Sequence, residues 1–246
     1  MKNSLRSLVS YFYSFLGPFL NEGDCRVLMY HSIQEFGKSM WITEYQNFQD
    51  QVYYVLNHKK KYFCACDELL KDSPKNSIVL TFDDGYVDNF QFVAPLLISL
   101  NIPFCIFVIT DYVKSGKEGY LDEKMLIELS RNPLITIGSH TKSHPRLAEC
   151  TYNQVQEELQ GSKKYLEDLL SKEITCFSYP HGSVSNNIKA QVIDAGYKLA
   201  FTSHFDVNNS LQDKYLINRN EIWGFDSLDN FIGKISGSYD WMKYKS

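Results

Sequence analysis

Short apolar segments recur along the chain and alternate with longer segments of helical periodicity. Most of the apolar segments are continuous rather than alternating, as in parallel strands that are covered on both faces. We therefore predict seven strands, at residues 25–33, 77–82, 103–110, 134–140, 174–180, 198–203 and 215–222.

Helical periodicity fills the intervals between these strands. Thr43 and Asp88 are candidate N-caps of the first two helices, Thr151 and Gln154 are spaced as a capping box, and Gly196 is a candidate C-cap. The predicted helices are residues 44–61, 89–101, 122–132, 151–172, 185–196 and 227–236.

Strands that alternate with helices predict a parallel α/β architecture. Seven strands fit a distorted (β/α)7 barrel, one domain spanning residues 25–246, better than an open doubly wound sheet, which stays an alternative. In both architectures the functional side chains belong at the carboxyl ends of the strands.

Residues 1–24 are expected to form a separate helical extension. Two basic residues precede an apolar stretch from Leu8 to Leu20, which is too short and too interrupted to span a bilayer and has no cleavage site after it. Residues 1–20 are either an interfacial helix in peripheral contact with a membrane or a helix packed on the barrel. We expect a cytoplasmic protein, either free or bound at the inner face of the membrane.

The charge pattern argues against one class of partner. The formal net charge is −4, and charged residues make up 22% of the chain. No basic stripe with interleaved aromatic residues occurs, so we expect no nucleic-acid binding.

The six cysteines are expected to be reduced. Their even number permits disulfides, but a chain of 246 residues does not need them for stability. Cys105 and Cys176 lie in apolar strands and are predicted to be core residues. Cys64 and Cys66 have no second pair at zinc-binding spacing, so they are weak metal-ligand candidates.

Polar side chains follow two of the predicted strands where each strand ends. Asp83 and Asp84 come directly after "IVLTF" and before Gly85, and His140 and His144 follow "LITIGS". Two imidazoles with one carboxylate are typical of a catalytic zinc site, and the other aspartate is then free to act as a base. Taken separately, the same residues are compatible with surface histidines and helix-capping acids.

Together, "LTFDDG", "SHTKSH" and "FSYPHG" resemble the motifs of the polysaccharide deacetylases, carbohydrate esterase family four. The resemblance runs from about residue 25 to 223 and implies a distorted (β/α)7 barrel that removes N-acetyl, sometimes O-acetyl, groups from sugars. It implies that Asp83 is the general base. It also implies that Asp84, His140 and His144 hold a divalent metal, most simply Zn²⁺, with other divalent transition metals compatible.

The chain departs from the family pattern at the general acid. Family members usually carry a late histidine in this role, and His204, which follows the third motif here, has a different context. The early "VLMYHSI" matches members whose motif order is circularly shifted, so we assign the acid role to His31. A histidine that only satisfies the strand end stays the alternative.

A second departure concerns an arginine of the third motif. Ser178 stands where the family usually has that arginine. Arg219, in "NRNEIW", is our candidate to supply a guanidinium to Asp83, with a purely structural ion pair as the alternative.

The loop "YPHG" is predicted to bind substrate. Tyr179, Pro180 and His181 would form it, with a backbone N–H at His181 facing the oxyanion. Tyr179 and Trp223 are candidates for stacking on a sugar ring, although packing at the rim explains both residues equally well.

These roles describe the hydrolysis of an acetamide. The cation lowers the pKa of a bound water, Asp83 takes the proton, and His31 protonates the leaving sugar amine. The expected partner is an N-acetylated sugar, oligosaccharide or lipid-linked glycan, as in cell-surface polysaccharide biosynthesis. A catalytically inactive glycan-binding module, an O-acetyl esterase and a non-sugar amidase remain alternatives.

Overall fold

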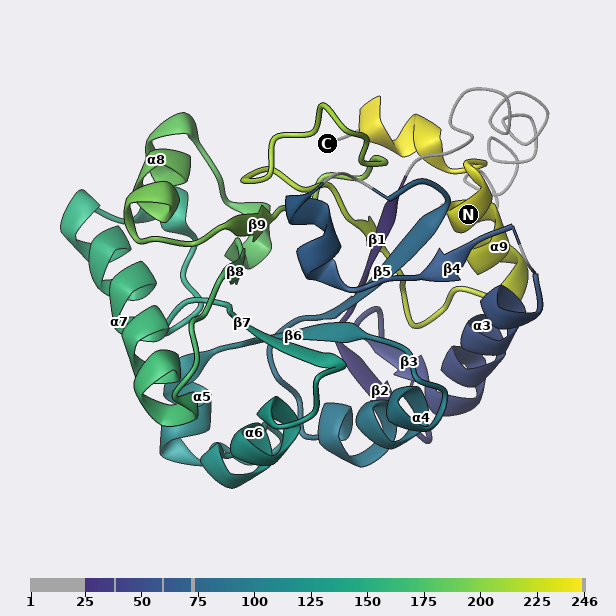
Figure 1. Ribbon diagram of the computed structural model, residues 1–246, viewed down its shortest axis with the longest axis horizontal. Coiled ribbons are helices and arrows are strands. Elements are labelled where there is room, and N and C mark those ends of the chain that lie inside the picture. Colours follow the sequence, from purple (N-terminus) through teal and green to yellow (C-terminus); the bar gives the residue numbers. More distant parts are fainter. Residues whose placement is uncertain (1–24, 38, 59, 72–73, 245–246) are drawn as a thin grey trace.

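A curled parallel sheet forms the centre of the protein in the computed structural model, which describes residues 25–37, 39–58, 60–71 and 74–244 (Figure 1). The strand order is β10-β1-β5-β6-β7-β8-β9. The strands are β1 (Arg26–Tyr30), β5 (Ser77–Phe82), β6 (Phe104–Val108), β7 (Ile135–Ser139), β8 (Cys176–Ser178), β9 (Leu199–Phe201) and β10 (Asn220–Glu221). The prediction of a parallel sheet from these seven segments is confirmed, whereas the N-terminal extension lies outside the described residues.

The segment just before β10 connects the two edges of this sheet. Ile217 forms a parallel bridge with Phe201 of β9, and its N–H donates to the carbonyl of Ala200 at 2.9 Å. Three residues later, Asn220 pairs with Leu28 of β1. The sheet therefore curls into a distorted barrel, as the sequence predicts. Between β9 and the segment that leads into β10, the pairing is an isolated bridge rather than a ladder.

Shorter strands flank the barrel. The strand expected over residues 25–33 is interrupted at His31, where β1 ends. Beyond that break, β2 (Ser32–Gln34) pairs in parallel with β3 (Ile42–Glu44), and β4 (Tyr62–Phe63) pairs with β5. The interruption places His31 at the mouth of the barrel rather than inside a strand.

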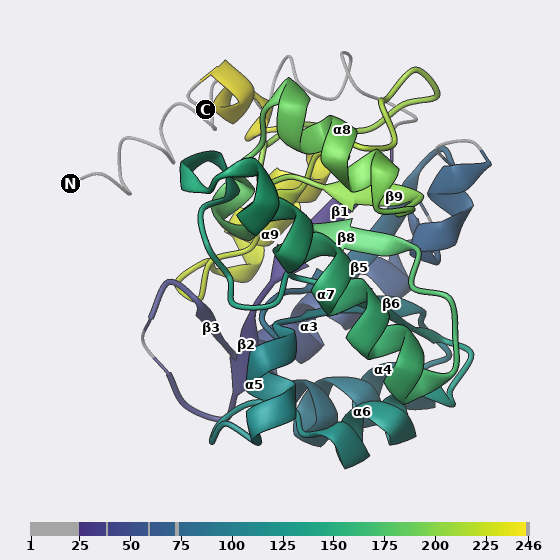
Figure 2. The ribbon, with the colours of Figure 1, turned by 90° about the vertical axis from the view of Figure 1, so that its left-hand side faces the viewer.

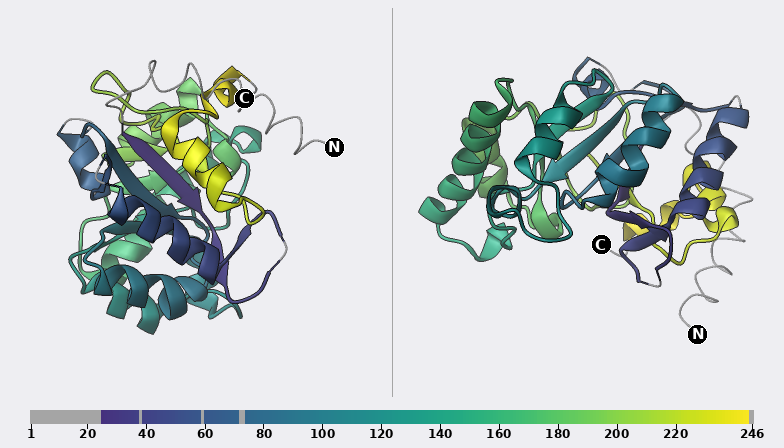
Figure 3. Two further views of the ribbon diagram at one scale, coloured as in Figure 1. Left: turned by 90° about the vertical axis from the view of Figure 1, so that its right-hand side faces the viewer. Right: turned by 90° about the horizontal axis from the view of Figure 1, so that it is seen from below.

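Helices cover the outside of the sheet. Figure 2 shows α7 and α8 beside β8, and Figure 3 shows α3 and α9 side by side near β1. The α-helices are α3 (Tyr45–Asn57), α4 (Ala94–Ser99), α5 (Thr110–Ser115), α6 (Glu123–Ser130), α7 (Tyr152–Leu170), α8 (Asn186–Asp194) and α9 (Leu228–Ser236). A π-helical turn (Asn89–Val93) precedes α4, and 3₁₀ turns lie at Cys66–Leu70, Leu147–Glu149, Pro180–Gly182 and Asp240–Tyr244. None of the helices in the described ranges has the length and hydropathy that a bilayer span requires.

The predicted caps are partly confirmed. Thr151 and Gln154 form the expected capping box of α7, and Gly196 follows α8 with a φ of 84°. Thr43 is not an N-cap, because it belongs to β3 and α3 begins one residue later than predicted. Asp88 precedes the π-helical turn, but its carboxylate accepts a hydrogen bond from Ser32 Oγ at 2.5 Å instead of capping the helix.

Alternate residues of the strands point into the barrel, as the period of two in a β-strand requires. Inside the barrel they form a buried cluster that includes Val27, Val79, Cys105, Phe107, Cys176, Phe201 and Ile217. The intervening residues, such as Leu28, Leu80, Ile106 and Phe177, belong to the cluster that packs with the helices. The next inward positions lie toward the carboxyl ends, where the polar residues begin.

The cysteines are all free thiols. Cys105 and Cys176 are core residues, as predicted, and Cys64 and Cys66 are buried in the same cluster. These thiols pack the floor of the barrel, and none of them belongs to the metal-binding group found among the described residues.

Candidate active site

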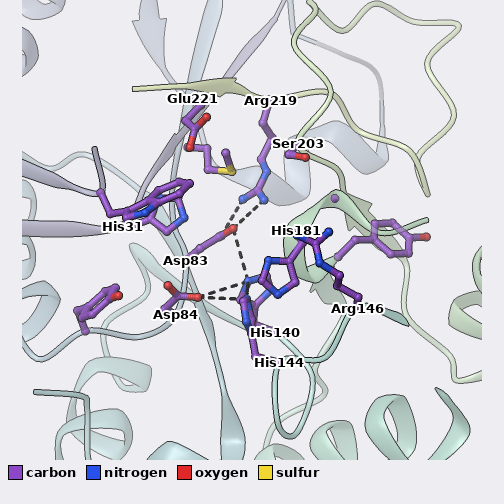
Figure 4. Close-up of a pocket in the computed structure, with 15 residues that line it drawn as sticks. His31, Asp83, Asp84, His140, His144, Arg146, His181, Ser203, Arg219 and Glu221 are labelled. Atoms are coloured by element: carbon purple, nitrogen blue, oxygen red, sulfur yellow. Dashed lines mark hydrogen bonds and ion pairs between the residues drawn. The ribbon is translucent and has the colours of Figure 1, made fainter. Parts of the chain in front are cut away.

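A pocket of about 460 Å³ opens at the carboxyl ends of the strands (Figure 4). This volume lies in the range of small-molecule sites. Residues after β1, β5, β7, β8 and β9 and in or beside β10 line it, although they are far apart in the sequence. The lining is Met29, His31, Trp41, Asp83, Asp84, Tyr86, His140, His144, Arg146, Tyr179, His181, Gly182, Ser203, Arg219 and Glu221.

Three side chains converge on one point of this pocket. Asp84 Oδ1 lies 3.6 Å from His140 Nε2 and 3.5 Å from His144 Nε2, and the two Nε2 atoms are 3.1 Å apart. Within the part of the chain that the structure describes, this is the group whose ligand atoms are close enough together to share a metal ion. The sequence predicted the same three residues.

The protonation of these groups fits a cation. His140 Nδ1 lies 2.8 Å from the carbonyl oxygen of Ser178, so Nδ1 carries the proton and Nε2 offers a lone pair. Burial, with His140 and His181 nearby, lowers the pKa of His144 to about 3, which favours the neutral imidazole. Asp84 Oδ1 is buried without a hydrogen bond. Two imidazole nitrogens this close to each other and to a buried carboxylate oxygen without a hydrogen bond form a site that suits a cation.

The backbone at both ends of this group is held in an uncommon conformation. Asp84, Gly85 and His144 all have positive φ, at 71°, 73° and 66°. Glycine is suited to this region, as the sequence predicted for Gly85, but Asp84 and His144 are strained there. Glu158 of α7 stabilises the loop between the histidines, because it accepts hydrogen bonds from the backbone N–H of Lys142 and Ser143 at 2.8 Å each.

Asp83 is buried beside this group and makes a two-pronged ion pair. Arg219 donates to both of its carboxylate oxygens at 2.7 Å, and Ser178 Oγ lies 3.2 Å from Asp83 Oδ2. Burial alone would raise the pKa of Asp83, but the Arg219 guanidinium outweighs it and holds the pKa well below its usual range. The guanidinium therefore reaches Asp83 from the residue just before β10, and Ser178 bonds both partners, since Arg219 also donates to its Oγ at 2.8 Å.

His31 lies across the pocket from the loop after β8 (Figure 4). Its ring packs edge-on against Trp41, with centroids 4.7 Å apart, and its carbonyl accepts a hydrogen bond from Asn89 Nδ2 at 3.2 Å. The ring is half-buried and faces the same space as Asp83. This position is compatible with the predicted acid role.

The loop after β8 is part of the pocket. His181 has a φ of 57°, and its ring lies 4.5 Å from that of His144. Pro180 is buried beneath it. Tyr179 lines the pocket but is only 1% exposed, and its hydroxyl donates to the carbonyl of Tyr215 at 3.1 Å.

Trp223 does not line the pocket, contrary to the stacking hypothesis. Its side chain is 7% exposed, and Lys234 Nζ lies 3.8 Å above the ring. Packing at the rim is therefore the alternative that the structure favours for Trp223, and the burial of Tyr179 favours it there too.

Six lining residues were missed by the sequence reasoning: Met29, Trp41, Tyr86, Arg146, Ser203 and Glu221. The alternation of side chains along a strand could have indicated Ser203 and Glu221. Each lies at the end of a predicted strand, two residues after a buried residue that points inward. Tyr86 and Arg146 lie two residues beyond predicted metal ligands. Trp41 had no such signal.

The rim of the barrel thus unites three possible metal ligands with a buried acid, an arrangement compatible with a metal-dependent hydrolase. The family profile described as polysaccharide deacetylase matches residues 70–200, which is more than half of the chain, so the protein belongs to the polysaccharide deacetylase family.

Individual relatives agree with this assignment. The chain is 28% identical over 200 residues to YxkH of Bacillus subtilis, whose name assigns it provisionally to the polysaccharide deacetylases; the match covers 78% of this chain and 69% of that one. It is 22% identical over 250 residues to the poly-beta-1,6-N-acetyl-D-glucosamine N-deacetylase of Staphylococcus aureus, with 89% and 85% covered. The fold superposes on the deacetylase PplD of Streptococcus pyogenes in complex with acetate with a TM-score of 0.78, at 23% identity and with 86% and 98% covered.

Proposed function

We propose that the protein removes N-acetyl groups from an N-acetylglucosamine oligosaccharide or polysaccharide, using a divalent cation held by Asp84, His140 and His144. One observation carries the proposal: three possible metal-ligand atoms meet beside a buried carboxylate whose pKa is held well below its usual range. The family and the name of the Staphylococcus aureus relative support the substrate class.

Two residues of this chain would move the protons. A bound cation supplies Lewis acidity that polarises the acetyl carbonyl and favours deprotonation of the attacking water. Asp83 accepts that proton, because its Oδ2 lies 3.7 Å from His140 Nε2 and therefore faces the ligand group. Arg219 keeps this carboxylate oriented and ionised through its two parallel hydrogen bonds.

His31 completes the reaction from the other side of the pocket. It holds a proton and gives it to the nitrogen of the leaving sugar as the C–N bond breaks. A backbone N–H at His181 is our candidate for stabilising negative charge on the acetyl oxygen. Acid and base lie in different surroundings, so the dependence of rate on pH should be bell-shaped.

The test measures acetate release and metal content together. The metal-loaded protein should release acetate from N-acetylglucosamine oligomers, and a chelator should abolish the release until Zn²⁺ is restored. Asp84→Asn should lose bound metal and fall to the chelated rate, because Asp84 supplies one of three ligands.

Asp50→Asn is the matched control, since Asp50 is an exposed carboxylate on α3 outside the pocket. It should retain both metal and rate. Failure of the metal-loaded protein to release acetate from any N-acetylated glycan would refute the proposal.

A further inference from the structure

Two charged side chains that line the pocket, those of Glu221 and Arg146, have no part in the proposed chemistry. Asp83 is neutralised by Arg219, and Asp84 belongs to the metal group. Glu221, at the end of β10, is half-buried and lines the same pocket, and its carboxylate forms no ion pair or hydrogen bond with the residues that the structure describes. A carboxylate in this position is available to a ligand.

Strand geometry fixes where this carboxylate points. Glu221 of β10 follows Arg219 by two residues in extended chain, so its side chain leaves on the inner face, where Arg219 reaches Asp83. Glu221 is also the register partner of Met29 on β1, and His31 follows Met29 by two residues. Glu221 therefore lies beside Met29, and His31 follows just beyond the end of β1 on the same side of the pocket (Figure 4).

The surroundings suit a cation on a sugar. Trp41, which is 45% exposed, lines the pocket beside His31 and offers an aromatic face for a sugar ring or an ammonium group. The other unused charge of the pocket, Arg146, lies on the opposite side near His181 (Figure 4). Glu221 is thus free of competition from this guanidinium.

We propose that Glu221 forms a subsite for the ammonium group of a glucosamine unit, so that the enzyme favours glycans that are already partly deacetylated. The inference rests on the proposed function, because deacetylation turns a neutral acetamide into an amine that is protonated at neutral pH. One round of reaction thereby creates the charge that the subsite recognises in the next substrate. If Glu221 bound a neutral sugar hydroxyl instead, the enzyme would not distinguish glycans with acetylated neighbouring units from glycans with deacetylated ones.

The test compares three trisaccharides of N-acetylglucosamine: one fully acetylated, and two with a single free amine at either end. The wild-type metal-loaded enzyme should favour one amine-bearing isomer in kcat/KM by about tenfold, the size of one charge-assisted hydrogen bond. Glu221→Gln should remove that preference, so that kcat/KM on the favoured amine-bearing isomer falls by about tenfold relative to kcat/KM on the fully acetylated trisaccharide. The preference should also shrink at high ionic strength.

Controls separate charge recognition from loss of structure. Glu35→Gln removes an exposed carboxylate outside the pocket and should keep the preference, and Glu221→Asp should restore part of it. Equal rate losses on all three trisaccharides in Glu221→Gln, or no preference in the wild type, would overturn the inference while leaving the proposed function intact.

A binding measurement covers the case in which no acetate is released. Calorimetry with the fully deacetylated trisaccharide should show binding to the metal-loaded wild type that Glu221→Gln weakens by about tenfold. Absence of binding, or equal binding by both proteins, would also overturn the inference.

Discussion

Replacing Arg219 by methionine tests the electrostatic design of the site. The guanidinium is 1% exposed and donates to both oxygens of Asp83 at 2.7 Å, to Ser178 Oγ at 2.8 Å and to the carbonyl of Thr202 at 2.7 Å. Arg219→Met leaves Asp83 as an unpaired buried carboxylate, which costs about 3–5 kcal/mol in free energy of unfolding. At about 2–4 °C per kcal/mol for a chain of this size, the thermal midpoint should fall by about 10 °C.

The pH dependence of this loss has a definite sign. Asp83 has a lowered pKa in the folded protein, so its ion pair stabilises the fold above the ordinary aspartate pKa, and that contribution disappears as the pH falls through the folded value. In the variant, burial is no longer opposed by Arg219, so the pKa of Asp83 rises. The stability difference between wild type and variant should therefore be full above the raised pKa of Asp83 in the variant. It should shrink as the pH falls through that value and on toward the lowered pKa of the wild type.

Catalysis should respond more specifically than stability. Turnover, measured as acetate release well below both thermal midpoints, should fall by at least about 10²-fold, because the base is neutralised or misoriented. Metal content by elemental analysis should be unchanged. Arg219→Lys keeps the charge without the fork of two bonds and should give an intermediate rate if the methionine variant does not fold.

A matched ion pair provides the control. Arg26, at the amino end of β1, binds Asp240 at 2.8 and 2.9 Å, and both side chains are buried. Arg26→Met should lower the thermal midpoint by a similar amount and leave turnover unchanged. The reasoning is wrong if the two methionine variants lose turnover equally, or if Arg219→Met keeps the wild-type rate.

Two further predictions concern the histidines. His31→Ala should lower turnover by about 10²–10⁴-fold and flatten the alkaline limb of the pH profile. The loss should be smaller on an acetylated substrate whose leaving group departs without being protonated. Equal losses on both substrates would contradict the acid role. The pKa of His144 is lowered to about 3, whereas the unfolded chain takes up this proton near pH 6.5, so the metal-free protein should lose stability as the pH falls between these values. His144→Gln should reduce that loss in denaturant unfolding with chelator present, and an unchanged pH dependence would exclude His144 as its source.

Much of the barrel could be predicted because its signals are local. Parallel strands read as continuous apolar segments, and the polar residues that end them meet at one rim by topology alone. For that reason Asp84, His140 and His144 could be grouped before any distance was known. The capping box of α7 is local in the same sense.

The positions of Trp41, which the sequence reasoning missed, and Trp223, which it offered as a stacking candidate, depend on contacts between distant segments. Trp41 reaches the pocket because the chain between β2 and β3 folds against the loop after β10, where Gly224 N–H donates to the carbonyl of Met40 at 2.9 Å. Trp223 is covered by Lys234 of α9, which also pairs with Asp226. No periodicity in either segment encodes these contacts.

The alternation of side chains along the last strand has a consequence for how such a protein can change over time. Ile217, Arg219 and Glu221 are spaced two residues apart, so their side chains point to the same face. Ile217 belongs to the buried cluster inside the barrel, Arg219 pairs with Asp83, and Glu221 lines the pocket. Gain or loss of a single residue here would turn Asn218 and Asn220 inward and remove all three at once. Surface loops can drift in length, but this stretch can vary only by substitution or in steps of two.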